Sequence, residues 1–197
     1  MSDTGKNKTL TTTKDGVGPV LMRHYSVLVA DSPLTPSEVM LRIRRDFPKL
    51  APATLAEFAK ETRKERLLKL DDEMSIKMPL TPLCKVRVVQ LDETTMTLQT
   101  FEGHPEAGRI SFRVVRVGRK MRVHIKSRAR SADVLRLAGY WLVGKMMQTR
   151  VWKEFLTRTA ALAEGRADGP VAVATTPSKE RRQDRPGSSR STFSRPG

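Results

Sequence analysis

The residues best placed for chemistry lie in one short loop, Gly-His-Pro-Glu-Ala-Gly, which runs from Gly103 to Gly108. His104 stands there between two carboxylates, Glu102 and Glu106. A carboxylate can orient an imidazole and raise its pKa toward neutrality, as general acid–base catalysis requires. His104 with Glu102 or Glu106 is therefore a candidate catalytic pair for a cyclase-like or hydrolase-like reaction.

The same loop also has a purely structural interpretation. Gly103 and Gly108 can adopt the positive φ that tight hairpin loops and bulges require. Pro105 forces the backbone of His104 to be extended. The sequence places no serine, cysteine or metal-binding cluster beside the histidine. Three interpretations therefore stay open: a structural turn, a loop that contacts a ligand, and a catalytic loop.

Metal binding is not indicated by the spacing of the possible ligands. His24, His104 and His124 lie on separate segments, and none forms an H-x-x-x-H pair. Cys84 is the only cysteine, so an intramolecular disulfide and a zinc site with several thiolates are excluded. We therefore predict no metal and no cofactor. A lone thiol also fits a reducing compartment, and we expect a cytoplasmic protein.

Alternating apolar and polar residues predict the strands that must position the loop. A first strand is expected over 18–31. A helix then begins at Thr35, with Pro36 at its first position and a capping box to Glu38, and is expected to end at Pro48. A second short helix is expected near Pro52. Six more strands are predicted over 65–70, 73–78, 84–91, 95–101, 108–117 and 119–129.

One long helix is predicted from Ser131, as its N-cap, to about Glu164, with Gly165 ending it. Its main stripe is apolar apart from Gln148. The aromatic and methionine side chains of this helix suit either an ordinary core or the wall of an apolar cavity. These side chains are Tyr140, Trp141, Met146, Met147 and Trp152.

This order of elements predicts an α+β fold. In it, a seven-stranded antiparallel sheet wraps around the long C-terminal helix, with two short helices after the first strand. We expect one such domain over 19–164, between a disordered segment at 1–18 and a disordered basic tail at 165–197. No apolar run is long enough to span a bilayer. The polar first segment also argues against a typical secretory signal.

The net charge of +16 favours anionic partners such as nucleic acid or an acidic surface. Basic residues recur at positions of neighbouring strands that could share one outward face. They are Lys85, Arg87, Arg109, Arg113, Arg122, Lys126 and Arg128. A sheet that reads single-stranded nucleic acid also presents aromatic rings for stacking, and this face has almost none. Two alternatives remain: a solvated face, and sequence-independent binding to phosphates.

Two strings carry a family resemblance, "FEGHPEAGRISFRV" and "IKSRARSADVLRLAG". They resemble an uncharacterised family, domain of unknown function DUF nineteen-ninety, within the START-like or polyketide-cyclase-like helix-grip (SRPBCC) superfamily. Its members show a G-H-P-E-x-G loop, then the last strand, then a Ser-Arg-rich stretch that opens the final helix. Here these correspond to Gly103–Gly108 and Ser127–Ser131, and the resemblance covers roughly 20–164.

The resemblance implies a helix-grip fold with an apolar or amphipathic small molecule bound between the sheet and the long helix. The residues expected to contact it are Glu102, His104, Glu106, Phe112, Met121, Tyr140 and Trp141. Family members tend to carry acidic residues just after the loop, where this chain has Arg109 and Ile110.

Overall fold

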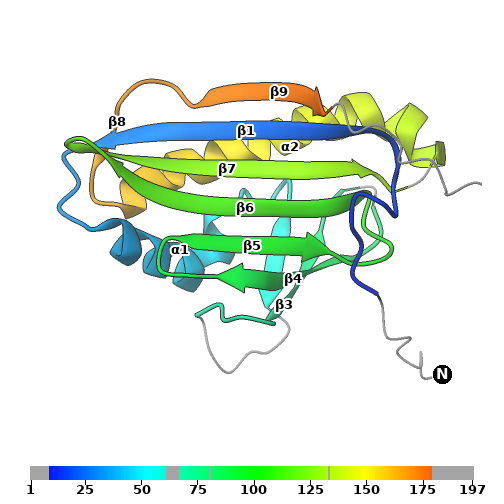
Figure 1. Ribbon diagram of the computed structural model, residues 1–197, viewed down its shortest axis with the longest axis horizontal. Helices are drawn as coiled ribbons and strands as arrows, with labels where there is room; N and C mark the ends of the chain where they lie inside the picture. The colour runs from blue at the N-terminus through cyan, green and yellow to red at the C-terminus, as the bar shows by residue number, and fades with distance from the viewer. Residues whose placement is uncertain (1–8, 61–66, 80, 133, 179–197) are drawn as a thin grey trace, which may run out of the picture.

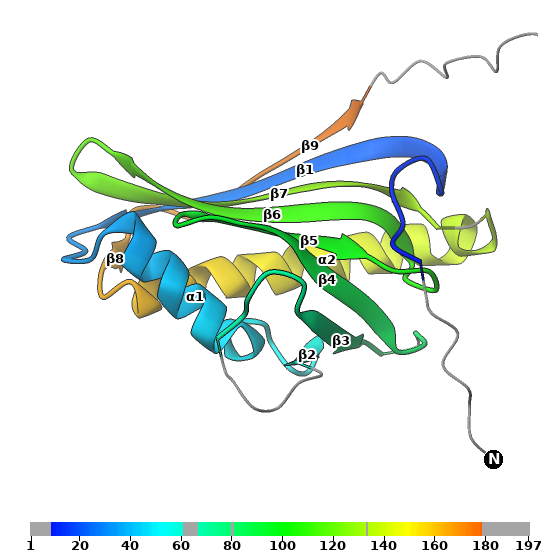
Figure 2. The same cartoon turned by 60° about the horizontal axis from the view of Figure 1, so that its bottom comes forward.

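The computed structural model describes residues 9–60, 67–79, 81–132 and 134–178; within its C-terminal helix, side chains are described from Gln148 onward. These residues form one antiparallel sheet with two helices, α1 and α2, on the same side of it (Figure 1 and Figure 2). The predicted class, an antiparallel sheet that grips a long C-terminal helix, is confirmed.

The sheet runs in the order β2-β3-β4-β5-β6-β7-β1-β8, and β9 also pairs with β1. Its strands are β1 (Val17–Ala30), β2 (Glu57–Lys60), β3 (Glu73–Lys77), β4 (Cys84–Leu91), β5 (Thr95–Thr100), β6 (Glu106–Val117), β7 (Lys120–Ser131), β8 (Arg166–Ala167) and β9 (Ala172–Ser178). Side chains alternate between the two faces of each strand. We call the face toward the helices the inner face and the opposite one the outer face.

Helix α1 (Pro36–Leu50) begins with the predicted capping box. The Thr35 hydroxyl accepts from the Glu38 backbone N–H, and the Glu38 carboxylate accepts from the Thr35 backbone N–H at 2.7 Å. Its buried residues, among them Val39, Ile43 and Phe47, face the core. Capping and an apolar stripe together account for the helix.

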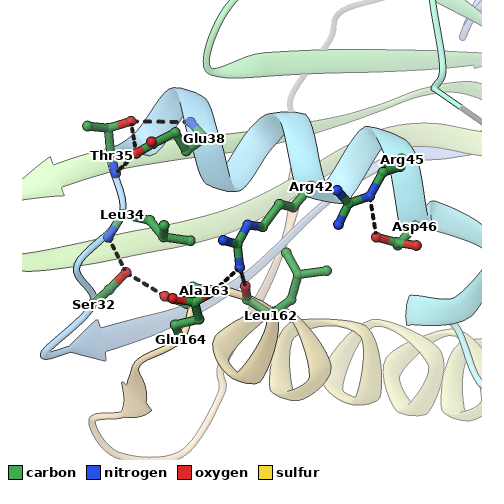
Figure 3. Close-up of polar contacts among 10 residues, drawn as sticks. All are labelled: Ser32, Leu34, Thr35, Glu38, Arg42, Arg45, Asp46, Leu162, Ala163 and Glu164. Carbon is green, nitrogen blue, oxygen red and sulfur yellow. Dashed lines mark hydrogen bonds and ion pairs between the residues drawn. The ribbon is translucent and has the colours of Figure 1, made fainter.

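The C-terminus of α2 (Val134–Leu162) is fixed by side chains from the start of the chain (Figure 3). Arg42 of α1 donates to the Leu162 carbonyl at 3.1 Å and pairs with Glu164 at 2.5 Å. The Ser32 hydroxyl donates to the Ala163 carbonyl at 2.6 Å. These contacts satisfy carbonyls that a helix end leaves without partners, and they hold α2 beneath the sheet.

Aromatic rings fill the space between the helices and the sheet. Phe47 of α1 lies 5.1 Å from both Phe112 of β6 and Phe155 of α2, measured between ring centroids. Trp152 packs on Phe112 at 5.5 Å and on Phe58 at 6.3 Å. The cluster ties α1, α2 and the sheet into one core, since edge-to-face ring contacts add to the burial of apolar area.

Two elements predicted between α1 and β3 are wrong. The expected second helix near Pro52 is a turn followed by the short strand β2, in which Phe58 is buried and pairs with Ile76 of β3. Packing of this one aromatic side chain outweighs the helical propensity of the alanines around it. The strand predicted over 65–70 is absent from its described part, 67–70, which is irregular.

At both ends, regular structure extends beyond the predicted domain bounds of 19–164. Residues 166–167 and 172–178, expected in a disordered tail, form β8 and β9 on the free edge of β1. Residues 9–16 are also placed, and Leu10 forms a β-bridge with Phe101. Backbone hydrogen bonds to an available sheet edge require no apolar side chains, so composition alone missed them. Residues 1–8 and 179–197 lie outside the described part.

Three predicted helix boundaries also differ. Pro48 lies inside α1 and has no N–H to donate to the Arg44 carbonyl. That carbonyl instead accepts from the Leu68 backbone N–H at 3.2 Å. Ser131 belongs to β7, so it does not cap α2; Asp133, expected in the first turn, lies outside the described residues. Glu164 adopts the positive φ, 53°, that the sequence assigned to Gly165. Gly165 is required for another reason: a Cβ there would lie 2.6 Å from the Ala30 carbonyl oxygen.

Candidate functional site

A cavity of about 100 Å³ lies between the inner face of the sheet and α2. Its wall is mainly apolar, with Phe58, Ile76, Leu98, Val151 and Trp152 among the lining residues. Polar groups are contributed mainly from one side, by the G-H-P-E-A-G loop and by Gln148 of α2. An apolar recess with a few polar groups is the usual form of a small-molecule site.

A buried polar network of Arg23, Glu106 and Gln148 borders this cavity. Arg23 of β1 donates to Glu106 Oε1 at 2.7 Å and also to Gln148 Oε1. Gln148 Nε2 donates to Glu106 Oε2 at 3.0 Å. Only 6% of the Arg23 side chain is exposed, so the carboxylate offsets a charge that water cannot reach.

The predicted pair between His104 and the Glu106 carboxylate does not form. His104 Nδ1 instead contacts the Glu106 backbone: it lies 3.0 Å from the Glu106 N–H, which can donate to it, and 2.9 Å from the Glu106 carbonyl oxygen, to which it can donate in the other tautomer. The Glu106 carboxylate instead contacts Arg23 and Gln148. Glu102 is exposed to solvent. The loop therefore holds His104 against its own backbone.

Gly108 ends the loop where two strands approach closely. A Cβ at this position would lie 2.2 Å from the Arg128 carbonyl oxygen of β7. The Thr100 hydroxyl accepts from the Gly108 N–H at 3.0 Å and donates to the Gly108 carbonyl at 3.1 Å. The second glycine of the motif thus allows β6 to pack tightly beside the cavity, a role beyond the turn geometry expected from the sequence.

Glu102 is exposed and does not line the cavity, and the other predicted ligand residues fall into three groups. His104 and Glu106 line the cavity, as does Trp152 of the long helix. Phe112 and Met121 are fully buried in the core and are not part of the wall of this cavity. The side chains of Tyr140, Trp141, Met146 and Met147 lie outside the described residues. Sequence reasoning did not single out Arg23, although Gln148 on an otherwise apolar stripe was a signal of a buried polar contact.

Two of the predicted anion-binding residues are occupied by contacts within the chain. Arg87 pairs with Glu73 at 2.5 Å and lies 5.0 Å from the ring centroid of Phe101. Arg128 donates to the Thr13 hydroxyl at 3.1 Å. Arg113, Arg122 and Lys126 are exposed on the outer face, as is Arg109.

No family model matches this sequence, and no curated protein matches it. Solved structures share its fold. Norcoclaurine synthase from Thalictrum flavum, in complex with dopamine and hydroxybenzaldehyde, is 13% identical, with a TM-score of 0.56 over 78% of this chain and 90% of that chain. The KanY protein, solved by NMR, is 15% identical, with a TM-score of 0.54 over 76% of this chain and 99% of that one.

A third structure is the di-domain ARO/CYC protein StfQ from the steffimycin biosynthetic pathway. It is 12% identical, with a TM-score of 0.55 over 77% of this chain and 52% of that chain, so this chain spans about half of it. These likenesses establish the helix-grip fold. Among the described residues, no helix is both long and apolar enough to cross a membrane.

Proposed function

We propose that this protein binds a small apolar or amphipathic molecule in the cavity between the sheet and α2. The observation that carries the proposal is the cavity itself, with an apolar wall and the polar groups of His104, Glu106 and Gln148. The narrower kinship with DUF nineteen-ninety and the cytoplasmic location are part of this proposal. They rest on the G-H-P-E-A-G loop and on the single cysteine.

The volume of about 100 Å³ limits what enters. An apolar cavity of roughly 150 Å³ accepts benzene, whereas sites for drug-sized ligands run to roughly 300 Å³ or more. We therefore expect one ring or a short alkyl chain inside, with any larger part of the molecule outside. The norcoclaurine synthase structure contains dopamine and hydroxybenzaldehyde, each with a single ring, which supports this size class for the fold.

One polar atom of the wall favours an amphipathic ligand. The indole Nε1 of Trp152 is buried and has no hydrogen-bond partner among the described residues. Buried donors are nearly always paired, so a donor left over in the wall of a cavity suits an acceptor oxygen of a ligand. The Glu106 carboxylate, already bonded to Arg23 and Gln148, fixes the shape of the polar side.

Native mass spectrometry of the purified full chain, followed by denaturing extraction, tests for a bound compound. The expected result is a mass above that of the chain, and extraction of an apolar or amphipathic molecule. A titration with the uncharged probe N-phenyl-1-naphthylamine complements it, because the probe fluoresces in apolar sites and has no anionic group to bind the basic outer face.

The matched variants are Ala56→Leu, in the cavity wall, and Ala161→Leu, on the exposed surface of α2. Ala56→Leu is expected to reduce probe binding several-fold, since it fills the space, while Ala161→Leu binds as the wild type. If the two variants bind the probe equally well, or if the wild type binds neither probe nor extractable compound, the proposal is wrong.

A further inference from the structure

The outer face of β5, β6, β7 and β1 carries a ladder of cations. Cross-strand pairing places Arg109 beside Arg128, Ser111 beside Lys126, and Arg113 beside His124. His24 of β1 then lies beside Lys126, and Leu28 beside Arg122. Successive rows of outward residues are about 7 Å apart, so the cations extend over roughly 20 Å.

No acidic residue interrupts this ladder. None of the described outward positions of the four strands is acidic: they include Met22, His24, Ser26, Leu28, Thr95, Thr97, Gln99, Ala107, Arg109, Ser111, Arg113, Val115, Val117, Lys120, Arg122, His124, Lys126, Arg128 and Arg130. At the β6–β7 turn, Lys120 pairs with Asp168 at 2.6 Å. Like charges directly opposite one another destabilise a sheet, as for Arg109 and Arg128. Arg109, Arg113, Arg122 and Lys126 are exposed, and none forms an ion pair with a described residue.

The pKa values of two histidines show how these cations affect the electrostatic potential of the outer face. The pKa of His124 is lowered to about 4, by burial first and then by Lys126, Arg113, Arg122 and His24. The pKa of His24 is also lowered, by burial and by Lys126. The patch formed by Arg109, Arg113, Arg122 and Lys126 therefore disfavours any further positive charge, which is the environment an anion prefers.

We propose that this patch binds the phosphates of a nucleic acid without reading its sequence. Apart from Arg109, which also borders the cavity, the patch and the cavity lie on opposite faces of the sheet, so the inference stands independently of the ligand. No aromatic side chain stands at an outward position for base stacking, which leaves phosphate contacts as the mode of binding.

The composition of the face favours nucleic acid over an acidic membrane. Among its large apolar members, Met22, Leu28 and Val115 are half-buried, and only Val117, at the end of β6, is exposed, at 39%, so the described face offers a bilayer one short side chain. Hydroxyl groups of Ser26, Thr95 and Ser111 stand among the cations and can donate to phosphate oxygens. A row of cations about 20 Å long also matches an extended polyanion.

The test is fluorescence anisotropy of the full chain with a labelled 20-nucleotide oligo(dT) and a labelled 20-base-pair duplex, between 50 and 200 mM NaCl. The test variant is Arg113→Gln/Arg122→Gln/Lys126→Gln. The control, Arg45→Gln/Arg150→Gln/Lys153→Gln, removes the same charge from exposed positions on the helices. The measured quantity is the slope of the logarithm of the association constant against the logarithm of the salt concentration. Each phosphate contact contributes about 0.7 to the magnitude of this slope for a single strand and about 0.9 for a duplex. We therefore expect the magnitude of the slope to be smaller by about 2 to 3 in the patch variant.

The control variant is expected to keep nearly all of the wild-type slope. Equal losses for the two variants, or an unchanged slope in the patch variant, would show that binding depends on general charge or on another segment, and would overturn the proposal. Binding to phosphatidylserine vesicles without binding to either oligonucleotide would overturn it in favour of a membrane surface.

A second measurement does not depend on the variants folding. NMR titration of the three histidines in the wild-type chain, with and without oligo(dT), follows His24 and His124 within the patch. Bound phosphates should raise the pKa of both His24 and His124, because an anion favours the imidazolium form. An unchanged pKa for His24 and His124 at saturating oligonucleotide would rule the patch out as the binding site.

Discussion

The two faces of strand β7 place side chains of opposite character in adjacent positions. Met121, Val123 and Ile125 point inward and are fully buried, whereas Arg122 and Lys126 point outward and are exposed. The inner face meets two helices, and the outer face meets none among the described residues (Figure 2). The same strand thus supplies both the wall of a core and a charged surface, because its side chains alternate.

The charged side chains on the two faces of the sheet differ in burial and in whether they pair with a carboxylate. The one arginine on the inner face of β1, Arg23, is paired with Glu106 and hydrogen-bonded to Gln148. Arg109, Arg113, Arg122 and Lys126 of the outer patch are exposed and form no ion pair with a carboxylate of the described residues. A buried charge without a partner costs several kcal/mol, whereas a solvated one costs little. The comparison therefore separates a charge needed for folding from charges available for a partner.

The largest expected effect is on the inner face. Glu106→Ala should lower the free energy of unfolding by about 3 kcal/mol, because it leaves Arg23 buried without its carboxylate. Urea unfolding followed by tryptophan fluorescence measures it. The double variant Arg23→Met/Glu106→Leu should cost less than the single one, and a loss below about 0.5 kcal/mol for Glu106→Ala would contradict the assigned role.

A second prediction compares neighbours on one strand. Ile125→Ala should lower the free energy of unfolding by about 2 to 5 kcal/mol, because it leaves a space in a fully buried site. Lys126→Ala should change it by less than about 0.5 kcal/mol, because the side chain is exposed. Denaturation midpoints of both variants give the answer, and similar losses would mean that the outer face is covered in solution.

Stability should depend on pH through His124. Its pKa is about 4 in the folded protein and near its ordinary value of 6.5 when unfolded, so the unfolded chain takes up the proton first as the pH falls. The stability that the neutral ring contributes is full above pH 6.5 and is lost between 6.5 and 4. Urea midpoints at pH 7 and pH 5 should therefore differ less in His124→Gln than in the wild type.

The smallest effect concerns coupling within the patch. Lys126→Gln removes a cation that lowers the pKa of both His124 and His24, so both values should rise slightly. NMR titration of the histidine ring protons resolves such a shift. A constant pKa at both rings would mean that burial alone accounts for the two lowered values.

The central part of the fold was predictable because each strand there repeats a clear pattern. Strands β3 to β7 and the capping box of α1 follow from alternation and from Thr35 and Glu38. The prediction failed where a strand depends on its neighbour rather than on its own residues. β9 is exposed along most of its length and is held by pairing with β1, and β2 depends on the burial of one side chain, Phe58.

The candidate site was predictable only in part. The G-H-P-E-A-G loop was located, and His104 and Glu106 do line the cavity. The contact between Glu106 and Arg23 could not be predicted from the sequence, because Arg23 lies eighty-three positions away, on a strand with many apolar residues. Only the folded sheet brings β1, β6 and α2 together, so long-range pairs of this kind leave little trace in local patterns.

The position of β1 has a consequence for how the chain folds. Both of its edges pair with strands much later in the chain: Val27 pairs with Val123 of β7, and Val20 with Ser178 of β9. Non-local pairing of this kind slows folding, since the ends of a long loop must meet before any contact forms. During synthesis, β1 is therefore made before the strands that pair with it, and unpaired strand edges of this kind favour aggregation of partly folded chains.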